Sequence, residues 1–199
     1  DYFKALLHLY RKYPACYELD QYPEGFYWIN PNDGDRSIYS FVRCSENGKD
    51  NLLFVCSGNT CRSPMAEVIA LAQMRACGGF GKSAVTSAGL AACPGDPANP
   101  ASVRVCADHN LDLSNHRSKS LTTDLIAASD HIYTMTQGQA LQLQRILPQY
   151  ADKVSSLIPD GDIKDPFGQN DTVYANCYEQ IDKAIQALVP QWQEELKKE

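Results

Sequence analysis

The chain has 199 residues, of which 44% are hydrophobic and 21% charged, a composition typical of a globular protein with room for one ordinary domain and a smaller segment. Its net charge of −6 argues against nucleic acid or an anionic membrane surface as the main partner. No apolar run approaches the roughly 18–20 residues that a membrane-spanning helix needs.

The first residues and the cysteines favour a cytoplasmic protein. Asp1-Tyr2-Phe3 brings neither the basic nor the apolar region of a secretion signal. The eight cysteines include no Cys-x-x-Cys pair, so a zinc ribbon is not expected. A chain with this much apolar core does not need a disulfide framework. We therefore expect reduced thiols and no metal or cofactor.

A small appended segment is predicted at 1–43. Apolar residues recur at helical spacing over residues 2–10, which predicts a helix. Two aromatic runs at 25–29 and 37–42 flank the turn-forming residues Asn30–Gly34, which predicts a β-hairpin.

The main domain is predicted at 51–199, after a polar linker at 44–50 that contains glycine and no large apolar side chain. Short β-branched runs alternate there with longer helical patterns. The predicted strands are 52–55, 84–87, 131–134 and 154–157, and the predicted helices are about 64–77, 99–109, 137–148 and 171–196. This alternation predicts an α/β fold, a four-stranded parallel sheet with helices on both faces, with its site beyond the carboxyl ends of the strands.

The chemistry-bearing motif lies between the first of these strands and the first helix. The strand ends at Val55 and a small polar loop follows, with Ser63 as the expected N-cap and Pro64 at the first helical position. Loop N–H groups and the positive helix end favour bound anions. The same field favours the thiolate over the thiol at Cys56.

Several residues of the loop are expected to help it bind phosphate. Gly58 permits backbone geometry that a side chain would block, and Asn59 can fix the loop through hydrogen bonds. Arg62 offers a planar fork for two phosphoryl oxygens. Ser63 can also donate its hydroxyl to the Cys56 thiolate. The predicted phosphate-binding residues are Ser57, Gly58, Asn59, Thr60, Cys61, Arg62 and Ser63.

The segment Cys56–Glu67, with the sequence Cys-Ser-Gly-Asn-Thr-Cys-Arg-Ser-Pro-Met-Ala-Glu, resembles the signature loop of the low-molecular-weight protein tyrosine phosphatases. The segments Thr86–Gly89, Leu113–Ser118 and Asp165–Phe167 resemble three further segments of that family. The resemblance implies the phosphotyrosine phosphatase I-like fold, which agrees with the pattern above, and a phosphatase that acts on a phosphorylated protein without a metal.

The mechanism implied by the resemblance uses three catalytic residues. Cys56 attacks phosphorus and forms a phosphocysteine, while Arg62 holds the phosphoryl oxygens. Asp165 acts first as general acid and then as base. Pro166 supports this role, because it biases Asp165 away from helical geometry. We interpret His116 as a structural histidine that hydrogen-bonds near Asn59.

The substrate and the second loop cysteine leave alternatives open. Phosphotyrosine is the expected substrate, but Thr60 resembles the bacterial branch of the family that includes protein arginine phosphatases. Phe167 is expected to form the pocket wall with Thr60. The resemblance implies that oxidation joins Cys61 to Cys56, whereas Cys61 can equally be a packed thiol. An arsenate reductase is not expected, because Cys93 and Cys106 are too far apart in sequence.

Residues 1–43 resemble a different family, the glycogen branching enzymes, at the join between the catalytic barrel and its C-terminal β-domain. The matching pieces are 5–15, 17–20, 24–29 and 40–43. The barrel's catalytic carboxylates lie outside such a segment, so neither glucan transfer nor glucan contact is expected. The rival interpretation is a glucan-associated binding module with an inactive phosphatase fold. The intact Cys56, Arg62 and Asp165 argue against it.

Overall fold

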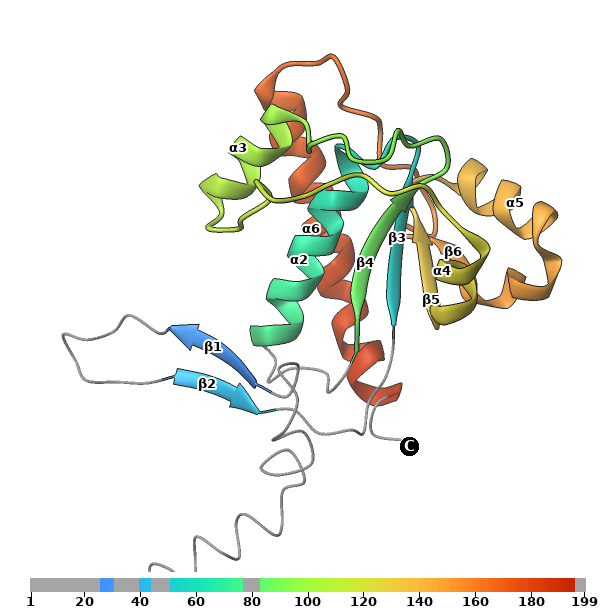
Figure 1. Ribbon diagram of the computed structural model, residues 1–199, viewed down its shortest axis with the longest axis horizontal. Coiled ribbons are helices and arrows are strands. Elements are labelled where there is room, and N and C mark those ends of the chain that lie inside the picture. Colours follow the sequence, from blue (N-terminus) through green and yellow to red (C-terminus); the bar gives the residue numbers. More distant parts are fainter. Residues whose placement is uncertain (1–25, 31–39, 44–50, 77–82, 196–199) are drawn as a thin grey trace, which may run out of the picture. The chain divides into compact units, whose positions relative to one another are not determined.

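The computed structural model describes residues 26–30, 40–43, 51–76 and 83–195 (Figure 1). The predicted helix at 2–10 and the linker at 44–50 lie outside these residues. Among the described residues, no helix combines the length and the apolar composition needed to cross a membrane.

The predicted hairpin strands are present in the N-terminal segment. Strands β1 (Phe26–Asn30) and β2 (Ser40–Arg43) pair antiparallel, with a register irregularity between Trp28 and Asn30. This pair forms a sheet of its own.

The main compact unit, residues 51–73 and 84–190, is built on a four-stranded sheet of order β4-β3-β5-β6 in which every pairing is parallel. Its strands are β3 (Leu52–Cys56), β4 (Val85–Gly89), β5 (His131–Thr134) and β6 (Val154–Ser156). Strand β3 is central and fully buried, as its unbroken apolar sequence requires in a sheet covered on both faces. The predicted α/β architecture is therefore confirmed.

Helices cover both faces of this sheet (Figure 1). On one face, Leu53 and Val55 of β3 pack in a core with residues of α4 (Thr123–Ala128) and α5 (Gln137–Ile146). On the other face, α2 (Arg62–Ala76) and α6 (Asp171–Glu195) lie side by side, joined by a hydrogen bond of 3.0 Å between Gln73 and Asp182. Helix α3 (Pro100–Asp108) and a short 3-10 helix, η4 (Pro148–Lys153), complete the described unit.

The predicted elements differ from the structure mainly at their ends and at α4. Helix α2 begins at Arg62, where a helix start at Pro64 was predicted, so the assignment of Ser63 as N-cap is wrong. The Cys61 carbonyl instead accepts the first helical hydrogen bond, from the Met65 N–H at 3.3 Å. Helix α4 was not predicted, because six residues are too few for a periodic pattern. Its sequence signal is Thr122, whose side chain caps the helix by accepting the Leu125 N–H at 3.2 Å.

Candidate active site

The candidate site lies beyond the carboxyl end of β3. Cys56 is the last residue of that strand and is buried, with 3% of its surface exposed. The loop of residues 57–61 follows, and α2 begins at Arg62. The loop is tied to the end of β4 and the segment after it, because the carbonyls of Cys56 and Ser57 accept the N–H groups of Leu90 and Ala91, both at 2.9 Å.

The Cys56 thiol is held by two hydrogen-bond partners. The Asn59 backbone N–H donates to Cys56 Sγ at 3.2 Å, and the Ser63 hydroxyl lies 3.0 Å from the same sulfur. Ser63 Oγ accepts a hydrogen bond from the Asn59 side-chain amide at 2.9 Å, so its own proton can go to the Cys56 sulfur at 3.0 Å or to the Ala88 carbonyl at 3.4 Å, and the sulfur is the nearer acceptor. Both partners can thus donate a hydrogen bond to the sulfur.

Asn59 holds the loop together. It is fully buried and has a φ of 55°, the left-handed region that asparagine tolerates better than most residues. Its amide donates to Ser63 Oγ and, at 2.8 Å, to Ser87 Oγ, and its amide oxygen accepts the Lys119 N–H at 2.7 Å. The residue with the unusual backbone conformation is therefore Asn59. The expectation that Gly58 has a backbone geometry that a side chain would block is wrong. A Cβ at Gly58 meets only Thr60 Oγ1, at an ordinary 3.7 Å.

A polar chain beneath the loop was not singled out from the sequence. Ser87, on β4, accepts a hydrogen bond from Asn59 and donates its own hydroxyl proton to Glu67 Oε2 at 2.5 Å. The partners are twenty residues apart, so no local pattern joins them. The chain of hydrogen bonds from Glu67 through Ser87 and Asn59 to Ser63 holds the Ser63 hydroxyl beside the Cys56 sulfur.

His116 lies where the sequence interpretation as a structural histidine requires. Its Nε2 is 2.8 Å from the Asn59 carbonyl oxygen, so we assign the ring proton to Nε2 as donor. Burial lowers the pKa of His116 below its ordinary value, and the hydrogen bond to Asn59 opposes this. Among the described residues, His116 makes its hydrogen bond to Asn59 and not to Cys56.

Gly89 is a further residue that the sequence did not single out by itself. A Cβ at this position would lie 2.8 Å from the Ser57 carbonyl oxygen and 3.0 Å from the Asn59 nitrogen, both backbone atoms. These distances are too short, so only glycine lets β4 approach the loop this closely.

Replacing Gly89 with alanine should therefore displace the loop and lower kcat/KM for p-nitrophenyl phosphate by about tenfold or more, because small misplacements of reacting groups are costly. Steady-state kinetics, with circular dichroism to verify folding, would measure the loss. The matched control is Gly58→Ala, whose added methyl meets only Thr60. Equal activity of Gly89→Ala and the original chain would contradict this account.

Arg62 is almost completely buried, at 4% exposure, and its guanidinium is already oriented. One terminal nitrogen donates to the Ile163 carbonyl at 3.0 Å, and the other forms an ion pair with Asp165 Oδ2 at 2.6 Å. Its Nε is buried without a hydrogen-bond partner. An unpartnered donor on a buried cation is expected where an anion is to bind.

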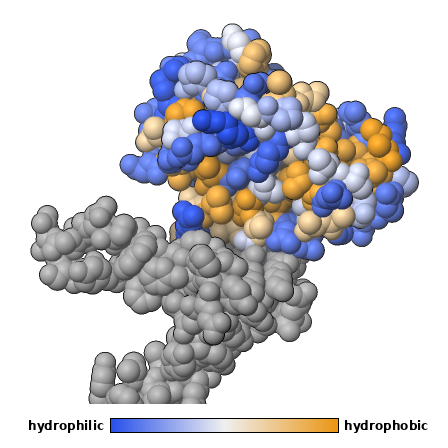
Figure 2. Space-filling view, in the orientation of Figure 1, coloured by the Kyte–Doolittle hydropathy of each residue, from blue (hydrophilic) through white to orange (hydrophobic). Residues whose placement is uncertain are grey.

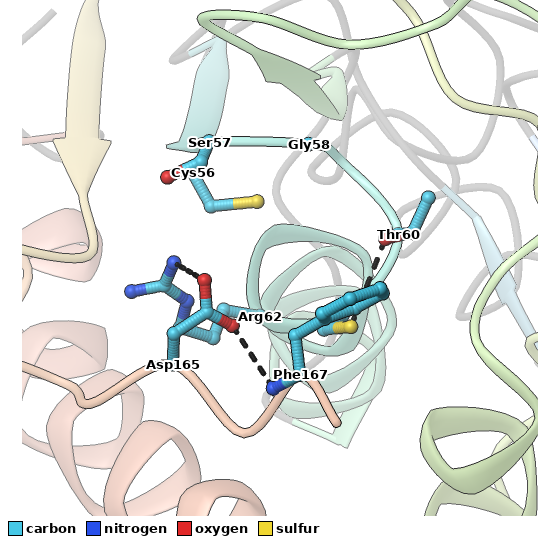
Figure 3. A pocket seen from close by; sticks show the side chains of 8 residues that line it. Cys56, Ser57, Gly58, Thr60, Arg62, Asp165 and Phe167 are labelled. Atoms are coloured by element: carbon cyan, nitrogen blue, oxygen red, sulfur yellow. Dashed lines mark hydrogen bonds and ion pairs between the residues drawn. The ribbon is translucent and has the colours of Figure 1, made fainter. Parts of the chain in front are cut away.

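Asp165 lies at the rim, with 47% of its side chain exposed. Its second oxygen accepts a hydrogen bond from the Phe167 N–H at 3.2 Å. This bond closes a short turn that includes Pro166. Phe167 is 67% exposed, a high value for a large apolar side chain. Both side chains stand across the opening from the loop that carries Cys56 (Figure 3).

These groups surround one cavity of about 220 Å³. It is lined by Cys56, Ser57, Gly58, Thr60, Cys61, Arg62, Asp165 and Phe167. The structure therefore brings together the predicted nucleophile, cation, carboxylate and wall residues, whereas Asn59, Ser63 and His116 support the loop from outside the cavity lining.

Cys61 is a free, buried thiol, as Cys56 is. Burial raises the pKa of Cys61, and hydrogen bonds opposing this shift include one to the Tyr174 hydroxyl at 3.4 Å. Cys61 is thus a weaker nucleophile at neutral pH than an exposed cysteine. Its oxidation to a disulfide with Cys56 stays a prediction.

A thiol at the head of a helix, an anion-binding loop and an apposed carboxylate define a cysteine-dependent phosphatase. The family model described as low molecular weight phosphotyrosine protein phosphatase matches residues 51–199. The chain belongs to this family.

Two relatives cover this part of the chain. The probable low molecular weight protein-tyrosine-phosphatase EpsP of Ralstonia nicotianae is 35% identical over 141 residues, which are 70% of this chain and 93% of the relative. The solved structure of the YwlE arginine phosphatase from Geobacillus stearothermophilus matches with a TM-score of 0.69 and 31% identity, over 75% of this chain and 96% of that one.

A separate match covers a short stretch of the chain. The 1,4-alpha-glucan branching enzyme GlgB of Butyrivibrio fibrisolvens is 60% identical over 55 residues, which are 28% of this chain and only 9% of that enzyme. The predicted resemblance to branching enzymes is confirmed. A match to 9% of an enzyme transfers none of its activity.

Proposed function

We propose that this chain hydrolyses phosphotyrosine in proteins through a phosphocysteine on Cys56. The observation that carries the proposal is the Cys56 sulfur, which lies beside the Asn59 N–H and the Ser63 hydroxyl in the lining of a cavity. Arg62 lines the same cavity, and its buried Nε has no hydrogen-bond partner. A tetrahedral dianion supplies acceptors for Nε and the loop N–H groups.

In the first step, the Cys56 thiolate attacks phosphorus in line with the leaving oxygen. An S–P bond forms and the P–O bond to tyrosine breaks, while Arg62 and loop N–H groups carry the charge of the equatorial oxygens. After it leaves Arg62, the Asp165 carboxylate takes a proton from solvent and gives it to the departing phenolate oxygen. Water then attacks the phosphocysteine, gives a proton to Asp165, and releases phosphate and the thiolate.

The Asp165–Arg62 ion pair must rearrange before this chemistry. In the structure the carboxylate accepts from the same Arg62 terminal nitrogen that a phosphate oxygen needs, at 2.6 Å. A bound dianion repels that carboxylate and competes for the guanidinium. We infer that phosphate binding turns Asp165 toward the leaving group, which its half-exposed position at the rim permits.

Phosphoarginine is the second candidate substrate. Thr60 lines the cavity where eukaryotic family members usually have a larger aliphatic residue, and the Geobacillus arginine phosphatase is a structural relative. Phosphotyrosine is placed first because the named EpsP relative is a probable tyrosine phosphatase at 35% identity.

The deciding experiment measures kcat/KM of the full chain on matched phosphotyrosine and phosphoarginine peptides. We expect hydrolysis of both kinds of bond to depend on Cys56 and phosphotyrosine to be the faster substrate. A higher kcat/KM for phosphoarginine would transfer the proposal to the arginine class, and no hydrolysis of either peptide would refute a phosphatase.

Thr60→Ile gives a second test of the substrate. A larger aliphatic side chain narrows the cavity beside Cys56, so phosphoarginine turnover should fall by about tenfold or more relative to phosphotyrosine turnover if arginine is the natural substrate. The ratio of kcat/KM values on the two peptides measures this selectivity. An equal loss on both would count against an arginine phosphatase.

We also propose that residues 51–199 form the catalytic domain, with 1–43 an appended segment that does not contact glucan and 44–50 a linker. A cytoplasmic location is supported by the described cysteines, Cys56, Cys61, Cys93, Cys106 and Cys177, which are all free thiols. The alternative of an inactive glucan-binding module predicts co-sedimentation with glycogen and no hydrolysis of p-nitrophenyl phosphate. We expect the reverse of both results.

A further inference from the structure

Gln139 connects a helix on one face of the sheet to the loop that carries the nucleophile. It lies in the first turn of α5, on the face opposite α2 (Figure 1), and only 9% of its surface is exposed. Its side-chain nitrogen donates to Ser57 Oγ at 3.1 Å. Its side-chain oxygen accepts the Met135 N–H at 3.1 Å.

These two contacts fix which way the amide faces. The Met135 N–H can only donate, so the amide oxygen must face it and the NH2 group must face Ser57. Ser57 Oγ is therefore the acceptor in that bond, and its own O–H proton points elsewhere. The Ser57 backbone is fixed as well, since its carbonyl accepts the Ala91 N–H at 2.9 Å.

Ser57 lines the cavity through which a leaving group would pass. Ser57 is exposed and directly follows the buried Cys56 at the start of the loop (Figure 3). In-line attack places the leaving group on the side of phosphorus away from the sulfur, which is the side of the opening. Among the described residues, Gln139 is the hydrogen-bond partner of this hydroxyl, and because Gln139 is the donor the Ser57 proton remains for a ligand.

We propose that Ser57, positioned by Gln139, presents a hydrogen-bond donor to the leaving group and so selects phosphate esters over phosphoguanidines. The bridging atom of an ester is an oxygen acceptor that gains negative charge as its bond to phosphorus breaks. A phosphoguanidine instead presents N–H donors around its bridging nitrogen, so a donor on the wall meets a donor on the substrate. The inference rests on the proposed function and makes Gln139 a positioning residue that acts through Ser57.

Gln139→Glu tests the direction of this hydrogen bond. A carboxylate keeps an acceptor for Met135 but replaces the NH2 group with a second acceptor, so the Ser57 O–H turns to donate to it. The lone pairs of Ser57 then face the cavity and suit guanidinium N–H groups. We expect the ratio of kcat/KM for a phosphotyrosine peptide to that for a phosphoarginine peptide to fall by about tenfold, the scale of one reversed hydrogen bond.

A double-mutant cycle separates this effect from a general disturbance. Ser57→Ala should lower the ratio by about threefold by removing the donor. In the Ser57→Ala background, Gln139→Glu should change the ratio no further, although the added charge lowers phosphate affinity for both peptides. Gln139→Met, which removes the donor without adding charge, should give a ratio between the original chain and Gln139→Glu, and thermal melts would verify folding.

These measurements distinguish a failure of the selection by Ser57 from a failure of the proposed phosphatase function. An original chain that hydrolyses neither peptide overturns both proposals. An active chain whose ratio is unchanged by Ser57→Ala and Gln139→Glu, or is changed equally by Gln139→Glu with and without Ser57, overturns the selection by Ser57 alone. A folding failure of Gln139→Glu leaves Ser57→Ala and Gln139→Met to decide, since an unchanged ratio in both again refutes the inference.

Discussion

Arg62→Lys is expected to lower kcat/KM for p-nitrophenyl phosphate by about 10³-fold while the fold is retained. Lysine keeps the positive charge but loses the planar fork, so it can supply neither the Nε donor nor two parallel hydrogen bonds to phosphate. It also leaves the Ile163 carbonyl without the guanidinium that donates to it at 3.0 Å. Steady-state kinetics and the inhibition constant of inorganic phosphate would measure both losses.

The chain offers a matched control for this substitution. Arg104 and Asp171 form an ion pair with the same 2.6 Å separation as Arg62 and Asp165, but both side chains are more than half exposed, at 57% and 64%. An exposed pair of this kind contributes little to stability. Arg104→Lys should therefore leave activity and melting temperature unchanged, and a similar loss in both variants would remove the special role of Arg62.

The sequence was most informative where the chemistry is local. Strand β3, the loop after it and the start of α2 are continuous in the chain, so Cys56 and Arg62 could be assigned from residue types and spacing. Asp165 is more than one hundred residues from Arg62, and only the resemblance to a family connected them before the structure.

Residues that support the site from other elements could not be predicted in this way. Gly89, Ser87 and Gln139 each act through one long-range approach to the loop, at β4 or α5. Glycine, serine and glutamine at such positions carry no local signal. The error at Gly58 has a related cause, because glycine indicates conformational freedom but does not reveal which neighbouring residue, here Asn59, takes the left-handed conformation.

Asp165→Asn is expected to lower kcat by about 10² to 10⁴-fold on a phosphotyrosine peptide. An amide of the same shape cannot give a proton to the leaving phenolate oxygen. The loss should be smaller for p-nitrophenyl phosphate, because p-nitrophenolate is a weaker base and leaves without a proton more readily. Comparing kcat across aryl phosphates of increasing leaving-group basicity measures this dependence.

Binding should respond to Asp165→Asn in the opposite direction to turnover. The carboxylate now holds the Arg62 guanidinium at 2.6 Å, and its negative charge repels an incoming phosphate dianion. The neutral amide competes less, so inorganic phosphate should inhibit Asp165→Asn at the same or a lower concentration than the original chain, while Asp171→Asn serves as the exposed control. A loss that is equal for every leaving group, together with weaker phosphate binding, would mean that Asp165 only orients Arg62 and that another group supplies the proton.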